Sequence, residues 1–264
     1  LWAREPEVVG AIRERGENTL YLPGHRLPEA VVCAGDLSEV LDGAEIVIMA
    51  VPSHGFREVL RRARPHLPAA ASLISVTKGI EQDSLKRMTE IVLEETGRPP
   101  ESVGVMTGPN LAREIADGQP AATVVAMSDG AAAEAVQALF MGPTLRVYTN
   151  PDVVGCEAAG ALKNVMAIAA GMAAGLGYGD TSTAALITRA LAELTRQGVA
   201  LGGRPRPFAG LAGMGDLVAT CISAQSRNRQ VGVALGQGRR LEEITAEMHM
   251  VAEGVKTTDA VLAL

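Results

Sequence analysis

Aromatic side chains are scarce in this sequence and make up 3% of its 264 residues. Without many of them, a core of normal size has to be built from Val, Ile, Leu, Met and Ala, which is typical of buried parallel sheets and tightly packed helices. A chain of this length can form two domains or one large one, and either would contain a substantial core.

Cysteine and histidine are also few, and neither occurs in a paired pattern. Cys33, Cys156 and Cys221 lie far apart in the sequence, and the four histidines form no ligand motif. This distribution predicts a reducing, cytoplasmic compartment and no structural metal.

Positive charge is in deficit, with a formal net charge of −6. Such a balance argues against a general nucleic-acid binder, but it permits a local basic pocket for a phosphorylated small molecule. No apolar run approaches the roughly 18 residues of a membrane span, and no signal peptide is visible, so we expect no membrane-spanning segment.

The first half of the sequence alternates strand and helix patterns. We expect strands at 1–2, 31–34, 45–50, 72–77, 103–107, 122–127 and 145–148. Helices are expected at 6–15, 56–63, 84–95, 111–116 and 131–140. Repeated strand–helix units with short links predict an α/β fold with a doubly wound parallel sheet of the Rossmann type.

The second half lacks convincing strands. Helical patterns cover 153–176, 182–201, 227–235 and 251–264, and the change follows the turn dipeptide Asn150-Pro151. We therefore expect a dinucleotide-binding domain over 1–150 and an all-α substrate and catalytic domain over 151–264.

Ligands of a doubly wound sheet bind beyond the carboxyl ends of its strands. The residues that follow the expected strands are small or cationic with no bulky plug, and they are Arg4, Pro52-Ser53-His54, Lys78-Gly79 and Gly108-Pro109-Asn110. This set suits a dinucleotide and a phosphate, although each residue type is also ordinary in turns. Arg4 favours the extra phosphate of NADP, whereas the adjacent Glu5 blurs the choice between NADP and NAD. Arg4 is equally well explained as an ordinary charge in the first turn of a helix.

An apolar stretch over 157–171 contains Lys163 and Asn164 side by side. Partial desolvation of a lysine favours its neutral amine and brings its pKa toward the range useful for proton transfer. This pattern indicates a general acid and base at Lys163. The alternative is a surface lysine whose stem covers apolar neighbours.

A glycine-rich bend over 210–217 contains Asp216, and it is followed by Thr220 and by Ser226-Arg227-Asn228 at the start of a helix. An aspartate beside a catalytic lysine orients it and stabilises its cation, and an arginine at a helix N-terminus suits a phosphate. The alternative is a helix cap at Ser226 with solvated arginines.

Five short motifs, in this order and spacing, resemble the bacterial type of the NAD(P)-dependent glycerol-3-phosphate dehydrogenase family. They are SVTKGIE (75–81), GALKN (160–164), GDL (215–217), SRNR (226–229) and VAEGVKT (251–257). The resemblance extends over the whole chain. It implies an oxidoreductase that interconverts dihydroxyacetone phosphate and sn-glycerol 3-phosphate with NADP or NAD and supplies phospholipid synthesis.

The resemblance also implies roles for individual residues. Lys163 would be the proton donor and acceptor, with Asp216, Lys78 and Asn164 as its catalytic partners. Substrate would contact Lys78, Gly108, Asn110, Lys163, Asp216, Ser226, Arg227 and Asn228, with Thr220 as a further pocket residue. The cofactor would contact Arg4, Lys78, Ala112, Arg227, Val251 and Glu253.

The sequence departs from the family pattern in two places. The family's GxGxxG phosphate turn would lie upstream of Leu1 and is absent, so we expect a sheet without its first strand and weak cofactor binding by the chain as given. The chain also starts without Met and stops at Leu264 within an apolar helical pattern, so both ends look cut. Asn110 stands where the family commonly has Ser or Thr, and its carboxamide can still bind a hydroxyl or phosphate.

Three other interpretations compete with this one. A related reductase could act on a hydroxyacid, a metabolite-binding protein could retain the pocket without catalysis, and a helical module could serve dimerisation. The SRNR motif favours a phosphate over a carboxylate, and the joint presence of Lys78, Lys163 and Asp216 favours an enzyme over a sensor. A homodimer is expected from the resemblance and is compatible with catalysis.

Overall fold

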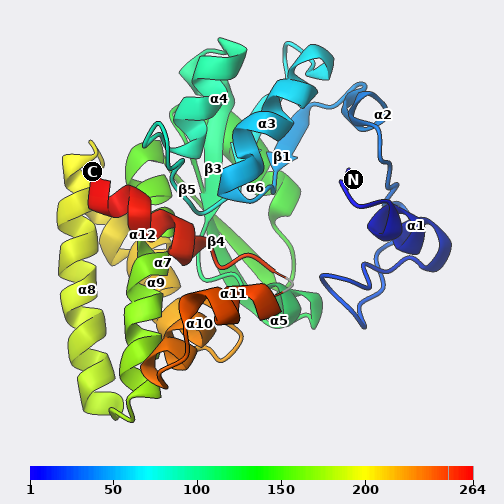
Figure 1. Ribbon diagram of the computed structural model, residues 1–264. Coiled ribbons are helices and arrows are strands. Elements are labelled where there is room, and N and C mark those ends of the chain that lie inside the picture. Colours follow the sequence, from blue (N-terminus) through cyan, green and yellow to red (C-terminus); the bar gives the residue numbers. More distant parts are fainter. Residues whose placement is uncertain (249, 264) are drawn as a thin grey trace.

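The computed structural model describes residues 1–248 and 250–263 (Figure 1). The N-terminal half contains α1 (Pro6–Arg15), α2 (Leu37–Leu41), β1 (Ile46–Met49), α3 (Ser53–Ala63), η1 (Arg64–His66), β2 (Ser72–Ser75), α4 (Met88–Thr96), η2 (Pro100–Ser102), β3 (Val103–Thr107), α5 (Ala112–Ala116), β4 (Ala121–Met127), α6 (Gly130–Phe140) and β5 (Leu145–Asn150). The C-terminal half contains α7 (Val153–Gly175), α8 (Asp180–Ala200), η3 (Arg206–Ala209), η4 (Leu211–Gly215), α9 (Asp216–Ile222), α10 (Arg227–Gly236), α11 (Leu241–Glu247) and α12 (Glu253–Ala263).

The five strands form one sheet in the order β1-β2-β3-β4-β5. This sheet, flanked by helices and followed by a helical half, confirms the expected doubly wound α/β class. The expectation that every strand is parallel is wrong at one place, because β3 and β4 pair antiparallel, with Thr107 opposite Val124. The link between them contains only the five-residue α5. A helix of about 7 Å is too short to return the chain to the start of a parallel strand.

The two strands expected nearest the N-terminus are reduced to a single bridge. Trp2 and Ala34 form an isolated parallel pair, and Trp2 packs against the core that β1 and α3 share. Figure 1 shows α1 and its neighbouring loop beyond β1, to one side of the sheet. This first segment therefore contacts the sheet domain through side chains.

Helix α4 begins at Met88, four residues later than expected. Ile80 and Arg87 form an antiparallel bridge, and Leu85 between them has a φ of 58°, which a helix does not allow. The short helices α2, α9 and α11 were not expected, whereas α1 and β3 match the expected ranges residue for residue. The last residue of the helix expected over 251–264 lies outside the described residues.

Helix α7 is the central element of the second half, and α8, α9, α10 and α12 pack around it (Figure 1). The helix has 23 residues, its most apolar 18-residue window has a mean hydropathy of 1.4, and it is long and apolar enough to cross a membrane. The expectation that no such run exists is therefore wrong for α7. Because 67% of its most apolar window is buried inside the protein, we interpret α7 as a core helix.

Candidate active site

Lys163 lies inside the protein, with only 4% of the residue exposed. Its Nζ donates to Thr220 Oγ1 at 2.6 Å and lies 3.2 Å from Asp216 Oδ1. Burial penalises the ammonium form and lowers the pKa of Lys163 to about 8, with Asp216 acting against this shift and Lys78 adding to it. A lysine with this pKa can both give and take a proton near neutral pH.

Asp216 connects two lysines. One carboxylate oxygen faces Lys163, and the other accepts from Lys78 Nζ at 2.7 Å. The glycine-rich bend expected before Asp216 is a π-helical turn, η4, that continues directly into α9, so Asp216 is the first residue of that helix. Thr220, one turn later, donates its own proton to the Asp216 carbonyl oxygen at 2.6 Å. Two cations therefore share one buried carboxylate.

Lys78 comes from the loop after β2, and Gly108 comes from the loop after β3. Lys78 Nζ donates to the Gly108 carbonyl oxygen at 2.9 Å. Gly108 has a φ of 155°, and a Cβ there would lie 3.1 Å from the Ala122 carbonyl oxygen. Asn110 Nδ2 donates to the same carbonyl at 3.1 Å, so its amide bridges the start of β4. The antiparallel β4 thus brings its first residues to the edge where β2 and β3 end.

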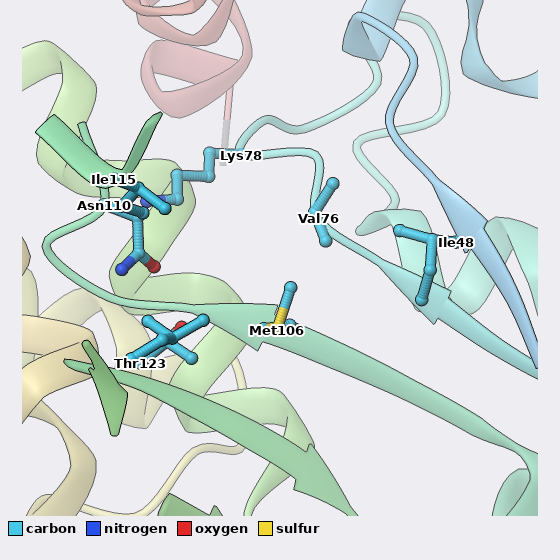
Figure 2. A pocket seen from close by; sticks show the side chains of 8 residues that line it. Ile48, Val76, Lys78, Met106, Asn110, Ile115 and Thr123 are labelled. Carbon is cyan, nitrogen blue, oxygen red and sulfur yellow. The ribbon is translucent and has the colours of Figure 1, made fainter. Parts of the chain in front are cut away.

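A cavity of about 290 Å³ opens beside these loops (Figure 2). Ile48, Val76 and Met106 form an apolar wall along the sheet, and the Lys78 side chain extends toward Asn110 at the polar end. The remaining lining residues are Ile115, Thr123 and Leu145. An apolar wall with an ammonium and a carboxamide at one end fits a nicotinamide ring and its amide.

Asn164 joins the second half of the chain to the first. Its Nδ2 donates to the Lys78 carbonyl oxygen at 2.9 Å, and its Oδ1 accepts from Asn228 Nδ2 at 2.9 Å. Asn228 in turn accepts from the Gly254 amide at 2.9 Å. The β2 loop, α7, α10 and α12 are therefore tied together by two asparagine side chains.

Ser226 and Arg227 lie at the start of α10. The Ser226 hydroxyl accepts from the Arg229 amide, which makes it the N-cap of the helix, as the alternative interpretation proposed. Arg227 is exposed, and its Nη1 donates to the Val251 carbonyl oxygen at 2.7 Å. The remaining guanidinium N–H groups of Arg227 form no hydrogen bond within the described part of the chain.

Glu253, the first residue of α12, reaches the first residue of α3, just beyond β1. Its carboxylate accepts from the Ser53 amide at 3.0 Å and from the Ser53 hydroxyl. Gly79 lies against this contact, since a Cβ there would be 2.6 Å from Ser53 Cβ and 3.0 Å from Glu253 Oε2. Val251 and Glu253 are thus fixed at the same sheet edge as Lys78.

Two predicted cofactor residues form no contact with this network. Arg4 pairs with its neighbour Glu5 at 2.9 Å, and the Arg4 side chain is 73% exposed. Ala112 is exposed at the first position of α5. Both remain predictions about a cofactor contact.

Sequence reasoning missed Thr107, the last residue of β3. Its hydroxyl is buried without a hydrogen-bond partner in the described residues, and it lies where a Cβ on Gly160 would come within 2.6 Å. The Gly160 position, one turn before Lys163, was the available signal, because a small residue there lets β3 approach α7. The sequence also offered no sign of the buried pair between Arg87 and Glu157.

No group of three or more His, Cys, Asp or Glu side chains is placed to hold a metal ion among residues 1–248 and 250–263. His249, one of the four histidines, lies outside this range. The chemistry of the described site therefore rests on lysine, aspartate, asparagine and arginine side chains.

Known proteins resemble this chain in sequence and in fold. A relative from Sphingopyxis alaskensis, named as a glycerol-3-phosphate dehydrogenase of the NAD(P)+ type, is 56% identical over 264 residues, which cover 100% of this chain and 79% of the relative. One from Moorella thermoacetica with the same type of name is 49% identical over 98% of this chain and 77% of its own. The crystal structure of glycerol-3-phosphate dehydrogenase from Coxiella burnetii matches with a TM-score of 0.95 and 38% identity, over 100% of this chain and 80% of that one.

The Rossmann-like sheet domain joined to a helical domain, together with these relatives at about 50% identity, identifies an NAD(P)-dependent dehydrogenase, which is an oxidoreductase. The model for the N-terminus of NAD-dependent glycerol-3-phosphate dehydrogenase matches residues 1–133, and that for its C-terminus matches residues 152–264. The chain belongs to the NAD-dependent glycerol-3-phosphate dehydrogenase family.

Proposed function

We propose that this chain catalyses the reversible reduction of dihydroxyacetone phosphate to sn-glycerol 3-phosphate with NADPH or NADH. The observation that carries the proposal is the buried carboxylate of Asp216 between two lysines. The carbonyl oxygen of the substrate gains negative charge as the ketone is reduced. Two ammonium groups that share one carboxylate carry a net positive charge, which stabilises that oxygen. The names of the relatives support the same activity.

Lys163 is the proton donor in this proposal. The reduced nicotinamide, when bound, supplies a hydride to the carbonyl carbon. Lys163 gives its proton to the developing alkoxide, and in the reverse direction its neutral amine removes the hydroxyl proton. Asp216 and Thr220 hold the Lys163 amine in place, and Lys78 and Asn164 stabilise charge beside it.

The phosphate of the substrate binds at the start of α10. Arg227 has one N–H committed to the Val251 carbonyl, which holds the guanidinium while leaving other N–H groups for phosphate oxygens. The Ser226 hydroxyl accepts a backbone hydrogen bond and keeps its own proton to donate. Asn228, Gly108 and Asn110 complete the substrate pocket. Binding of the phosphate orients the carbonyl against the proton donor.

The cofactor lies along the edge formed by the loops after β1, β2 and β3. Lys78, Ala112, Arg227, Val251 and Glu253 hold its nicotinamide half, and Arg4 lies at the adenosine half. The apolar wall of the cavity in Figure 2 would contact one face of the nicotinamide ring. Arg4 favours NADP, and pairing with Glu5 weakens that preference.

We also propose a metabolic role, a compartment and an oligomeric state for the enzyme. The product would supply glycerophospholipid synthesis in the cytoplasm, and the three free, buried cysteines support a reducing compartment. The active form would be a homodimer, and the exposed apolar residues Met172, Leu176 and Tyr178 at the end of α7 are compatible with a buried interface. The domains would divide at Asn150-Pro151.

The test is oxidation of NADPH and of NADH by dihydroxyacetone phosphate, followed by the loss of nicotinamide absorbance with the complete natural protein. We expect turnover with both cofactors and faster turnover with NADPH. Folded protein that turns over a 2-ketoacid but not dihydroxyacetone phosphate would support a hydroxyacid reductase instead. Binding of the phosphorylated triose without turnover of any substrate would support a metabolite-binding protein.

A further inference from the structure

Two helices that carry candidate site residues lie side by side in Figure 1, α7 with Lys163 and α10 with Arg227. Each has two glycines four residues apart on the face toward the other helix. They are Gly171 and Gly175 of α7 and Gly232 and Gly236 of α10. We call these four glycines, together with Asn164 and Asn228, the α7–α10 seam.

Gly171 and Gly232, the glycine pair of the seam nearer to Asn164, have no room for a side chain. A Cβ on Gly171 would lie 2.2 Å from the Arg229 carbonyl oxygen, and a Cβ on Gly232 would lie 2.0 Å from the Ile168 carbonyl oxygen. Real Cβ atoms do not approach other atoms within 3.0 Å. Because the blocking atoms belong to the backbone, they cannot rotate away as a side chain would. Any larger residue must push the two helices apart.

Gly175 and Gly236, the second glycine pair of the seam, repeat this backbone contact one turn later. A Cβ on Gly175 would lie 2.3 Å from the Val233 carbonyl oxygen, and a Cβ on Gly236 would lie 2.4 Å from the Met172 carbonyl oxygen. The helices therefore stay in backbone contact over two turns, which fixes both their separation and their sliding position.

The two helices run in the same direction. Asn164 contacts Asn228, Gly171 contacts Gly232, and Gly175 contacts Gly236, so residue numbers rise together along the seam. The N-terminus of α10 consequently lies at the level of Asn164. Lys163 and Arg227 each immediately precede one member of the asparagine pair.

A third helix closes the site end of the seam. The Gly254 amide, in the first turn of α12, donates to Asn228 Oδ1 at 2.9 Å, and a Cβ on Gly254 would lie 2.6 Å from the Asn164 carbonyl oxygen. The asparagine pair is buried, with 3% of Asn164 and 8% of Asn228 exposed. Displacement of α10 therefore has to break hydrogen bonds that water cannot readily replace.

We propose that the α7–α10 seam is the positioning element that sets the separation between Lys163 and Arg227, and that it thereby confines efficient reduction to a phosphorylated ketone. This inference rests on the proposed function, in which Lys163 protonates the carbonyl oxygen and Arg227 binds the phosphate. The carbonyl and the phosphate of one small substrate are a fixed number of bonds apart, so the two side chains must keep a matching separation. A misplacement on the order of 1 Å can cost about 100-fold in rate.

The test compares two substrates in Gly232→Ala and Gly236→Ala. The substrates are dihydroxyacetone phosphate and dihydroxyacetone, which lacks the group that Arg227 binds. Gly10→Ala is the matched control, because Gly10 is also helical and a Cβ there meets nothing within 4 Å. The readout is the ratio of kcat/KM for the phosphorylated substrate to that for the unphosphorylated one.

We expect this ratio to fall about 10-fold to 100-fold in Gly232→Ala and to stay at the wild-type value in Gly10→Ala. A merely structural role would reduce the fraction of folded enzyme and lower both values of kcat/KM equally, so an unchanged ratio overturns the inference. Gly236→Ala lies a full turn farther from Arg227 and carries the test if Gly232→Ala does not fold. Absence of wild-type turnover would contradict the proposed function itself, whereas wild-type turnover with unchanged ratios would contradict the seam alone.

Discussion

Lys163 Nζ lies 3.2 Å from Asp216 Oδ1, and the other oxygen of the same carboxylate already binds Lys78 at 2.7 Å. Asp216 therefore cannot neutralise both ammonium groups. Burial and the charge on Lys78 lower the pKa of Lys163, and Asp216 limits the fall, which leaves it at about 8. This balance keeps Lys163 largely protonated near neutral pH and still able to lose its proton.

Replacement of Lys163 by Met tests its role as the proton donor. The Lys163→Met side chain fills similar space without a proton or a charge, so we expect kcat to fall about 10²-fold to 10⁴-fold. The KM for NADPH should change little, because Lys78 remains in place. Lys256→Met is the control, since Lys256 is exposed on α12. A kcat within about threefold of the wild type would exclude Lys163 as the donor.

The pH dependence of the two directions should be opposite. Reduction needs the ammonium form of Lys163, so its kcat/KM should fall as pH rises through about 8. Oxidation of the alcohol needs the neutral amine, so its kcat/KM should rise through the same pH. Initial rates across this range with each substrate would check both limbs. Two limbs that bend in the same direction would argue for a different titrating group.

Much of the fold was predictable because local signals were strong. Helix α1 has proline at its start and Gly16 after it, and the structure gives that glycine a φ of 65° at the C-cap. The antiparallel pairing of β4 was missed, since a strand pattern does not record direction. The shortness of the helix expected over 111–116 was the signal to read, because the 13-residue link from 108 to 120 is by itself long enough for a parallel crossover.

The candidate site was less accessible to sequence reasoning. The chemistry of the Lys163, Asp216 and Arg227 side chains indicated proton transfer and phosphate binding. That the three belong to one site was predicted only from the resemblance to the glycerol-3-phosphate dehydrogenase family. Their convergence depends on tertiary packing that no local pattern encodes. The spacing of Gly171 with Gly175 was visible in the sequence, but nothing local indicates which helix approaches such a pair.

Replacement of Asp216 by Asn tests the electrostatic coupling between the lysines. Asp216 raises the pKa of Lys163, so its neutral isostere should lower the pH at which the oxidation rate reaches half its maximum. We also expect a lower kcat, because Lys78 loses its carboxylate partner. Asp259→Asn on the exposed side of α12 is the control. A midpoint at or above the wild-type pH would contradict the coupling.

A second buried ion pair should matter for stability and not for chemistry. Glu157 on α7 accepts from Arg87 Nη1 at 2.7 Å and from the Thr89 amide at 2.8 Å, with 2% of Glu157 exposed. Glu157→Gln leaves the buried Arg87 without its strongest counterion, which should lower the free energy of unfolding by about 3 kcal/mol. Glu94→Gln removes a carboxylate whose side chain is 45% exposed and should lower the stability much less than Glu157→Gln does.

Chemical denaturation of both variants measures their free energies of unfolding. Steady-state kinetics of the same variants measure whether KM and the pH profile change. Glu157 lies nearly two turns before Lys163 on the same helix, and its partners come from the start of α4. The pair therefore anchors α7 to the sheet domain without touching the site. Because the folded fraction keeps its geometry, KM and the pH profile should match the wild type in Glu157→Gln. Equal losses of stability in the two variants would show that water reaches Arg87 and that the pair is not buried in solution.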